Sequence, residues 1–195
     1  MVFSSNQNSE GFISIDCGAE EDYLDGITGI SYKTDKDFIS TGNNMFVAPE
    51  YHLTTPYDGK MANSLRTFPE GKRNCYTLKP REGKNQNYYV RAFFYYGNYD
   101  SKNRTQIKFD LYLGVNHWTT VVVEDMDWTY YGIIHYSVTD TINVCLVNTG
   151  SGVPFINGLD LRFMNDSPYR NMNGSLSPRV QADLGGLDPT ETSMR

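Results

Sequence analysis

The residues of this sequence with the most evident chemical use are tyrosines, amides and carboxylates in polar segments. Tyrosine accounts for 15 of the 195 residues, and its ring joins an apolar face to a hydroxyl that tolerates water. Such groups suit sugars, because rings pack on C–H faces while polar atoms order the hydroxyls. The predicted ligand site comprises Tyr51, Tyr57, Tyr96, Asn98, Tyr99 and Asp100.

Two alternatives stand beside this carbohydrate site. Tyr96 and Tyr99 either face a ligand or pack over the end of the expected hairpin of residues 88–114, and the sequence does not separate the two arrangements. Exposed tyrosines are also common hot spots in protein interfaces, so the partner is alternatively a peptide or a co-receptor. Asp125 and Trp128 are possible additions to the site.

Residue patterns typical of catalysis are absent from the sequence. It contains no nucleophile elbow, no HExxH, no phosphate-binding glycine loop and no kinase signature. His52, His117 and His135 are isolated, so we expect them to be structural. Asp125 and Asp127 are a poor pair for glycoside hydrolysis, because nothing on an exposed turn would raise the pKa of one carboxyl. We expect no enzyme activity, with a sandwich-fold glycosidase as the least favoured alternative.

The charge of the chain excludes further classes. A net charge of −6 and a pI near 5.0 oppose nucleic-acid binding, which needs a basic surface. The acidic cluster Glu20, Glu21, Asp22 and Asp25 lacks the alternating ligands of a calcium loop. We therefore predict no metal and no cofactor.

The three cysteines, Cys17, Cys75 and Cys145, fit neither a zinc-ligand spacing nor a CxxC motif. At most one disulfide can form within the chain. Cys145 lies in an apolar run, VCLV, and is expected to be a small buried hydrophobe. Whether Cys17 pairs with Cys75 stays open.

Sequons and hydropathy bear on localisation. Asn103, Asn165 and Asn173 begin N-x-S/T sequons in expected loops and are predicted glycosylation sites, which favours an extracellular origin. No segment reaches the roughly 20 apolar residues of a membrane span. The first ten residues, MVFSSNQNSE, have no basic or apolar region of a secretory leader.

Two strand-like runs dominate the pattern of elements. Residues 88–96 (YYVRAFFYY) and 106–114 (QIKFDLYLG) are interpreted as one central hairpin joined by a polar loop. In the first run Val90, Ala92 and Phe94 share one face. The opposite face carries Tyr89, Arg91, Phe93 and Tyr95, so it is either covered by another segment or forms a binding surface.

Further short strands are expected at 12–18, 65–68, 73–78, 117–125, 130–138, 142–147 and 154–163, and residues 42–64 are expected to form a long irregular loop. No helical period exceeds two turns. The fold class is therefore all-β, an antiparallel sandwich resembling a jelly roll. Residues 1–10 are predicted to be a polar leader, 11–166 the domain and 167–195 a linker.

A family resemblance rests on motifs that occur in order: GFISIDCG, LRTFPEGKRNCYTL, YYVRAFFYYGNYDSKN, FDLYLGVNHW, IIHYSV and VCLVNTGSGVPFINGLDLR. Residues 11–163 resemble the malectin-like extracellular domain of plant leucine-rich-repeat receptor kinases. The resemblance implies a β-sandwich similar to animal malectin, a lectin for glucose-containing oligosaccharides. It also implies a place outside the plasma membrane and a carbohydrate or peptide ligand.

The resemblance also bears on the site and on the length of the chain. The sugar loop of the lectin corresponds to residues 97–100, where Tyr99 retains a ring and Asn98 stands in place of another. Such ectodomains usually hold two modules in tandem, and residues 175–195 resemble the segment that leads into the second. We therefore expect a fragment or shortened product of a receptor whose membrane span lies elsewhere.

Overall fold

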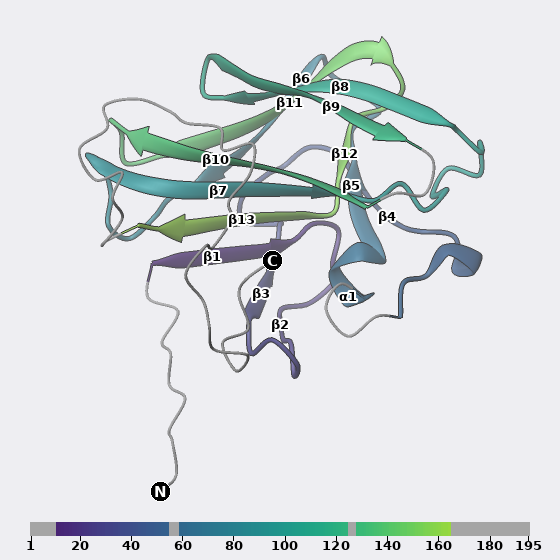
Figure 1. Ribbon diagram of the computed structural model, residues 1–195, viewed down its shortest axis with the longest axis horizontal. Helices are drawn as coiled ribbons and strands as arrows, with labels where there is room; N and C mark the ends of the chain where they lie inside the picture. Colours follow the sequence, from purple (N-terminus) through teal and green to yellow (C-terminus); the bar gives the residue numbers. More distant parts are fainter. Residues whose placement is uncertain (1–10, 55–58, 125–127, 165–195) are drawn as a thin grey trace, which may run out of the picture.

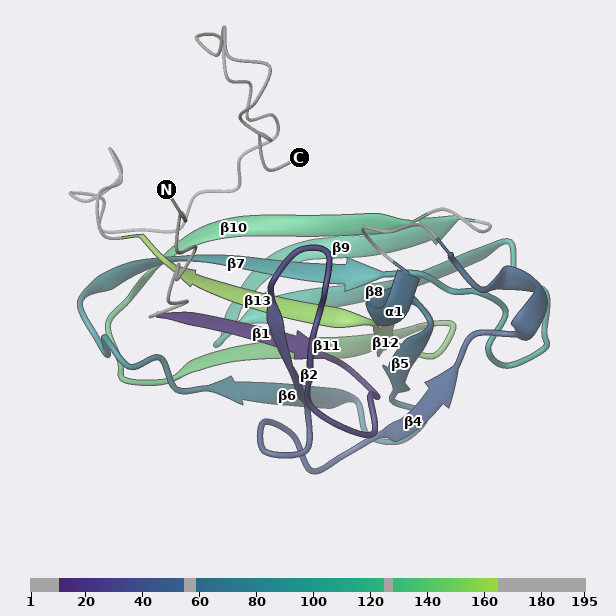
Figure 2. The ribbon, with the colours of Figure 1, turned by 90° about the horizontal axis from the view of Figure 1, so that it is seen from below.

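The computed structural model describes residues 11–54, 59–124 and 128–164 and consists mainly of β-strands. The largest sheet has six strands, of which four lie side by side in Figure 2 in the order β10, β7, β13 and β1. The complete order is β10 (Thr129–Ser137), β7 (Gln86–Phe94), β13 (Gly158–Phe163), β1 (Phe12–Asp16), β3 (Ser31–Thr34) and β2 (Tyr23–Leu24). All pairs are antiparallel except β1 with β3.

A four-stranded antiparallel sheet forms the second layer, above the first in Figure 1. Its order is β6 (Arg73–Leu78), β11 (Ile142–Ser151), β8 (Gln106–Leu113) and β9 (Asn116–Glu124). In β8 the residues Ile107, Phe109, Leu111 and Leu113 are buried, and the residues between them are partly exposed. This alternation of period two puts one apolar face of each sheet into a shared core, which confirms the predicted all-β sandwich.

A small third sheet lies at one end of the sandwich, in the order β12 (Phe155–Ile156), β5 (Ser64–Thr67) and β4 (Asn43–Phe46). A 3₁₀ turn, η1 (Pro49–Tyr51), and a single helical turn, α1 (Gly59–Ala62), flank it. The expectation that 42–64 is irregular throughout was therefore wrong for β4, η1 and α1. Short elements of this kind are formed by tertiary contacts and leave no period in the sequence.

The predicted central hairpin was also wrong, although both of its strands exist. The strand β7 pairs with β10 and β13, whereas β8 pairs with β9 and β11 in the other layer. The loop of residues 95–105 therefore crosses from one sheet to the other. An 11-residue connection readily spans the roughly 10 Å between packed sheets.

The expected strand at 154–163 is divided at Asn157, because β12 and β13 belong to different sheets. The Asn157 side chain donates to the carbonyls of Ala62 and Ser64 at 3.1 and 2.9 Å and accepts from the Tyr95 amide at 2.7 Å. One buried amide thus satisfies backbone groups of three segments where the strand breaks.

The cysteine expectations needed a correction. A disulfide joins Cys75 of β6 to Cys145 of β11, which lie directly opposite each other with Cα atoms 4.0 Å apart. Cys145 is buried as expected, but its sulfur is in a disulfide and is not a free thiol. Cys17 is buried and free, so it does not pair with Cys75. The sequence left this pairing open because strand register was unknown.

Two carboxylates are buried where the three sheets meet. Asp35 accepts two hydrogen bonds from Arg66, at 2.5 and 2.6 Å, and one from the Tyr76 hydroxyl at 3.0 Å. Asp16 accepts from the hydroxyls of Ser64 at 2.5 Å and Tyr23 at 2.7 Å. Burial exceeds the effect of these hydrogen bonds and raises the pKa of Asp16 to about 6.

Candidate functional site

The loop between β7 and β8, residues 95–105, contains most of the predicted site residues. Four consecutive or nearby positions adopt positive φ: Gly97, Asn98, Ser101 and Asn103. Glycine and asparagine tolerate this region better than other residues, which explains why the sequence GNYDSKN forms so tight a loop. A side chain at position 97 would also collide with Val47, because its Cβ would lie 2.4 Å from the Val47 Cβ.

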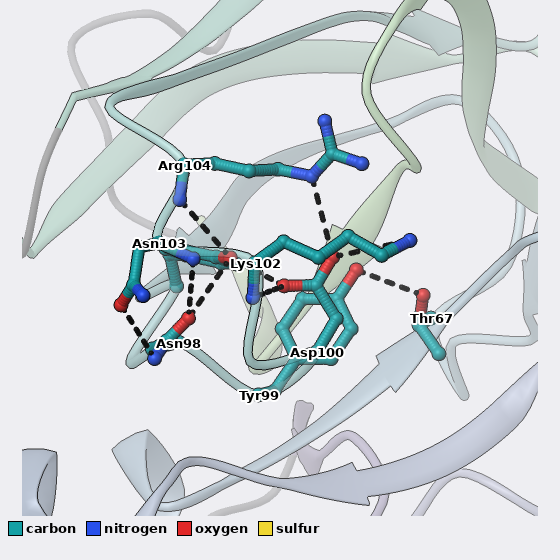
Figure 3. Close-up of polar contacts among 8 residues, drawn as sticks. Thr67, Asn98, Tyr99, Asp100, Lys102, Asn103 and Arg104 are labelled. Carbon is teal, nitrogen blue, oxygen red and sulfur yellow. Dashed lines mark hydrogen bonds and ion pairs between the residues drawn. The ribbon is translucent and has the colours of Figure 1, made fainter.

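Hydrogen bonds between side chains hold this loop closed (Figure 3). The Tyr96 hydroxyl donates to the Asp100 carboxylate, and Arg104 Nε donates to the same group at 3.3 Å. The Asn98 side chain donates to Asn103 Oδ1 at 2.9 Å, and its own Oδ1 accepts from the backbone N–H of Asn103 at 2.9 Å. Partial burial raises the pKa of Asp100, but the bonds from Tyr96 and Arg104 exceed that effect and lower it overall.

The rings of Tyr96 and Tyr99 are buried, with 1% and 9% of their surface exposed. They pack edge to face at 5.5 Å, and both contact Phe155 in the core. The Tyr99 hydroxyl lies 3.1 Å from Thr67 Oγ1 (Figure 3). Both rings are therefore packed and do not form a ligand platform, but they pack on Phe155 and not over the end of a hairpin, because β7 and β8 do not pair.

The other predicted residues are placed as follows. Asn98 is buried and Asp100 is partly exposed, so the structure brings Tyr96, Asn98, Tyr99 and Asp100 together in one loop. Tyr51 lies nearby and is partly exposed, with its carbonyl accepting from the Tyr95 hydroxyl at 2.8 Å. Tyr57 and Asp125 lie outside the described residues, whereas Trp128 is described and packs on Phe93 of β7, not on this loop.

Of the three sequons, the one at Asn103 lies in the described part of the chain. Its side chain is exposed, and Oδ1 accepts a hydrogen bond from the Asn98 side chain (Figure 3). Asn165 and Asn173 lie outside the described residues.

A second surface was not assigned to a site from the sequence. The outer face of the six-stranded sheet carries a band of rings and arginines, called here the aromatic–arginine face and made up of Phe12, Tyr89, Arg91, Phe93, Trp128, Tyr130, Asp160 and Arg162. Strand register brings these residues together: Tyr130 and Gly158 flank Phe93, and Gly132 and Asp160 flank Arg91. The signal in the sequence was the amphipathic second face of the run at 88–96.

Ion pairs and ring contacts organise this face. Asp160 accepts from Arg91 at 2.9 Å and from Arg162 at 3.4 Å. The Arg91 guanidinium lies 4.6 Å from the Phe93 ring centre, and that of Arg162 lies 4.6 Å from the Phe12 ring centre. Two arginines share one aspartate, so the cluster keeps an excess positive charge on a chain of net charge −6.

Gly132 shapes the same face. A Cβ at this position would lie 2.3 Å from the Tyr89 hydroxyl oxygen, so the absence of a side chain lets the Tyr89 ring lie across β10. Tyr130 and Phe12 are 53% and 43% exposed at the two sides of the band. The surface is therefore ordered by packing and still accessible at its edges.

Within residues 11–54, 59–124 and 128–164, no group of three or more His, Cys, Asp or Glu side chains could hold a metal ion. No helix in that part of the chain is long and apolar enough to span a membrane.

A two-layer antiparallel β-sandwich with ordered loops at one end defines the architectural class, which serves as a scaffold for many functions. Comparison with known families makes the assignment specific. A family model described as the malectin-like domain matches residues 15–194, so the chain belongs to the malectin-like family. This confirms the resemblance drawn from the sequence.

Curated relatives come from Arabidopsis thaliana. The chain is 41% identical over 184 residues to the probable LRR receptor-like serine/threonine-protein kinase At4g20450, covering 87% of this chain and 20% of the relative. It is 42% identical over 186 residues to the probable kinase At1g05700, covering 93% of this chain and 21% of the relative. The chain thus spans about a fifth of these relatives.

Solved structures support the fold. The ANX2 ectodomain from Arabidopsis thaliana matches with a TM-score of 0.63 at 16% identity, over 78% of this chain and 42% of that one. A complex described as plant peptide RALF23 with FER and LLG2 matches with a TM-score of 0.58 at 16% identity, over 80% and 40% of the two chains. At this identity the likeness establishes the architecture alone.

Proposed function

We propose that this chain is a non-catalytic recognition module of a plant receptor kinase, located outside the membrane, that binds a peptide or protein partner. The observation that carries the proposal is the family match over residues 15–194 together with relatives named as receptor kinases. The kinase in those names belongs to proteins about five times longer than the matched region, and the malectin-like family is a receptor module.

The packing of the loop tyrosines favours a protein partner over a sugar. A sugar-binding platform needs a free ring face, and the faces of Tyr96 and Tyr99 are taken by each other and by Phe155. Protein interfaces instead use mixed surfaces of tyrosine, arginine and amides. A related fold is solved with the peptide RALF23, which makes a secreted peptide the first partner to test.

The test is binding of peptides and co-receptor ectodomains to the purified chain on a sensor surface, with and without cell-wall oligosaccharides in excess. We expect at least one polypeptide to bind and to stay bound when the oligosaccharides are added. Displacement by free oligosaccharide, or binding of oligosaccharides alone, would contradict the protein-binding proposal.

Carbohydrate binding is the second candidate, and the partial exposure of Tyr51 favours it. Calorimetric titration of Tyr51→Ala against cell-wall oligosaccharides tests this version, because the Tyr51 ring is only partly buried against the core and its loss removes less packing than the loss of a fully buried ring. Tyr99→Ala is unsuitable as the sole variant, since the ring is buried and its loss costs about 3–5 kcal/mol of stability. Absence of heat in the wild type would remove the sugar version.

An extracellular module passes through the secretory pathway, so we also propose that Asn103 carries a glycan. Its side chain is exposed, and Thr105 completes the sequon at a position that is also exposed. We expect the protein secreted from plant cells to carry a glycan on Asn103. Peptide N-glycosidase would then remove the glycan and convert Asn103 to aspartate, which mass spectrometry of the peptide detects. Thr105→Ala should abolish it, and an unmodified Asn103 in the secreted wild type would refute the assignment.

A further inference from the structure

The outer faces of the two large sheets differ sharply in composition. Outward positions of the four-stranded sheet carry ordinary polar residues, such as Thr77, Lys108, Asp110, Thr120 and Asn143. The strands β10, β7, β13 and β1 contain no lysine and no glutamate, and their outward positions carry rings and arginines, with Ser14, Ile134 and Asp160 among them. Antiparallel sheets that face water normally show polar residues there.

Enrichment in tyrosine, tryptophan, phenylalanine and arginine with depletion of lysine and glutamate is the composition of a buried protein interface. We propose that the aromatic–arginine face is a docking surface for a peptide segment that carries a carboxylate next to an apolar side chain. This inference rests on the proposed function and names the surface and the chemistry of the partner.

Charge complementarity selects the carboxylate. Arg91 and Arg162 share the single carboxylate of Asp160, which leaves one positive charge unpaired in this cluster. Within the described residues, Arg91 Nε and Asp160 Oδ1 make no hydrogen bond although both are buried. The two arginine side chains are 25% and 21% exposed. A planar guanidinium binds carboxylates strongly, and both guanidiniums are already oriented by stacking on rings.

The apolar part of the partner has a defined place as well. Tyr130 is the most exposed ring of the face at 53%, and it lies beside Phe93, whose ring centre is 6.2 Å away, with Trp128 next to it at 5.5 Å from Phe93. An aliphatic or aromatic side chain of the partner can cover Tyr130 and Phe93 while a carboxylate of the same segment reaches the arginine pair, with Arg91 two positions from Phe93 on β7 and Arg162 beyond it on β13.

The same geometry disfavours a sugar on this surface. The faces of the Phe93 and Phe12 rings are each occupied by a guanidinium at 4.6 Å. A sugar ring stacks on an unobstructed aromatic face, so it would have to displace the arginines.

The experiment is selection of a random displayed peptide library on the full chain, followed by synthesis of the enriched peptides. We expect them to share Asp or Glu beside an apolar residue. Arg162→Gln and Tyr130→Ser should each weaken binding about tenfold or more. The matched controls on the four-stranded sheet, Lys108→Gln and Tyr112→Ser, should change it by less than about twofold.

A change in the peptide provides the reciprocal test. Replacing the shared carboxylate by its amide should weaken binding to the wild type about tenfold and have little further effect on Arg162→Gln. Circular dichroism and thermal unfolding of each variant verify that the fold is retained.

Several outcomes would overturn the inference, and they differ from failure of the proposed function. Peptides that bind both face variants as tightly as the wild type would place the partner elsewhere and leave the proposed function standing. A library that yields no binder would refute the inference, and the proposed function would then rest on the binding of co-receptor ectodomains to the sensor surface. Wild-type dimers that dissociate in Tyr130→Ser would show that a second copy covers the face. Binding of a uronic-acid oligosaccharide that Arg162→Gln abolishes would assign the face to sugars.

Discussion

The burial of single residues decides which side chains of this chain can contact a ligand. The sequence indicated that tyrosines would gather near the end of β7, and they do, but the direction of each ring depends on the crossing of the loop between the sheets. Tyr96 and Tyr99 point into the core because Phe155 lies beneath them. A pattern of residue types in a loop contains no information on such directions, whereas period-two alternation in strands does.

Asp16 provides a pH test at the same scale. Its pKa is raised to about 6 from 3.8, so the folded state binds the proton more tightly than the unfolded state. The stability that it contributes is complete below about pH 4 and is lost as pH rises through about 6. We expect Asp16→Asn to gain about 3 kcal/mol relative to the wild type between pH 4 and pH 7, at roughly 1.4 kcal/mol per pKa unit.

Urea unfolding of both proteins across this pH range measures that difference. Asp25→Asn is the control, and its dependence on pH should have the opposite sign. Hydrogen bonds from Thr28 lower the pKa of Asp25, so the stability that Asp25 contributes is lost as pH falls. If the difference in unfolding free energy between Asp16→Asn and the wild type does not vary with pH, the raised pKa of Asp16 is contradicted.

At the scale of elements, close approach of β1 and β5 depends on a glycine. Gly18 follows β1 with a φ of +87°, and a Cβ there would lie 2.2 Å from the Leu65 carbonyl oxygen. Gly29 has a similar φ of +68° but open space around it. We expect Gly29→Ala to lower the free energy of unfolding by about 1 kcal/mol, from backbone strain alone. Gly18→Ala should lower it by at least about 2 kcal/mol more, because of the clash with Leu65.

Chemical denaturation of the two variants separates backbone strain from the steric clash. Equal losses for Gly18→Ala and Gly29→Ala would show that β1 and β5 can move apart without cost.

The disulfide is the covalent link between β6 and β11. Its cysteines are separated by 70 positions, so reduction would release a long loop in the unfolded chain. Cys75→Ser combined with Cys145→Ser is expected to lower the free energy of unfolding by about 2–4 kcal/mol. Cys17→Ser changes a buried thiol without breaking a disulfide and is the comparison. A double variant as stable as the wild type under oxidising conditions would contradict the prediction.

The existence of most strands was predictable, but their partners were not. Alternation and turn residues indicated β7 through β11 in the sequence, because local pattern fixes which face is apolar. The hairpin interpretation failed since β7 and β8 lie in different layers, and a polar loop of that length permits either connection. Strand pairing is a long-range property, which also explains the missed disulfide.

For the whole molecule, the predicted domain of residues 11–166 can be tested directly. The last strand, β13, is central in its sheet and pairs with both β1 and β7, so the sandwich closes at residue 163. We expect a chain of residues 11–166 to give the same far-UV spectrum and a thermal midpoint within about 4 °C of the full chain, a difference below roughly 1 kcal/mol. A markedly lower midpoint would show that later residues stabilise the fold.

One carboxylate connects all three sheets of the molecule. Asp35 follows β3, and its oxygens accept from Arg66 on β5, from Tyr76 on β6 and from the Gly18 amide at the end of β1. Sliding one layer past another would strip this anion of its partners in a dry environment, which is costly. We therefore expect the three sheets to resist sliding past one another when the domain is placed under tension.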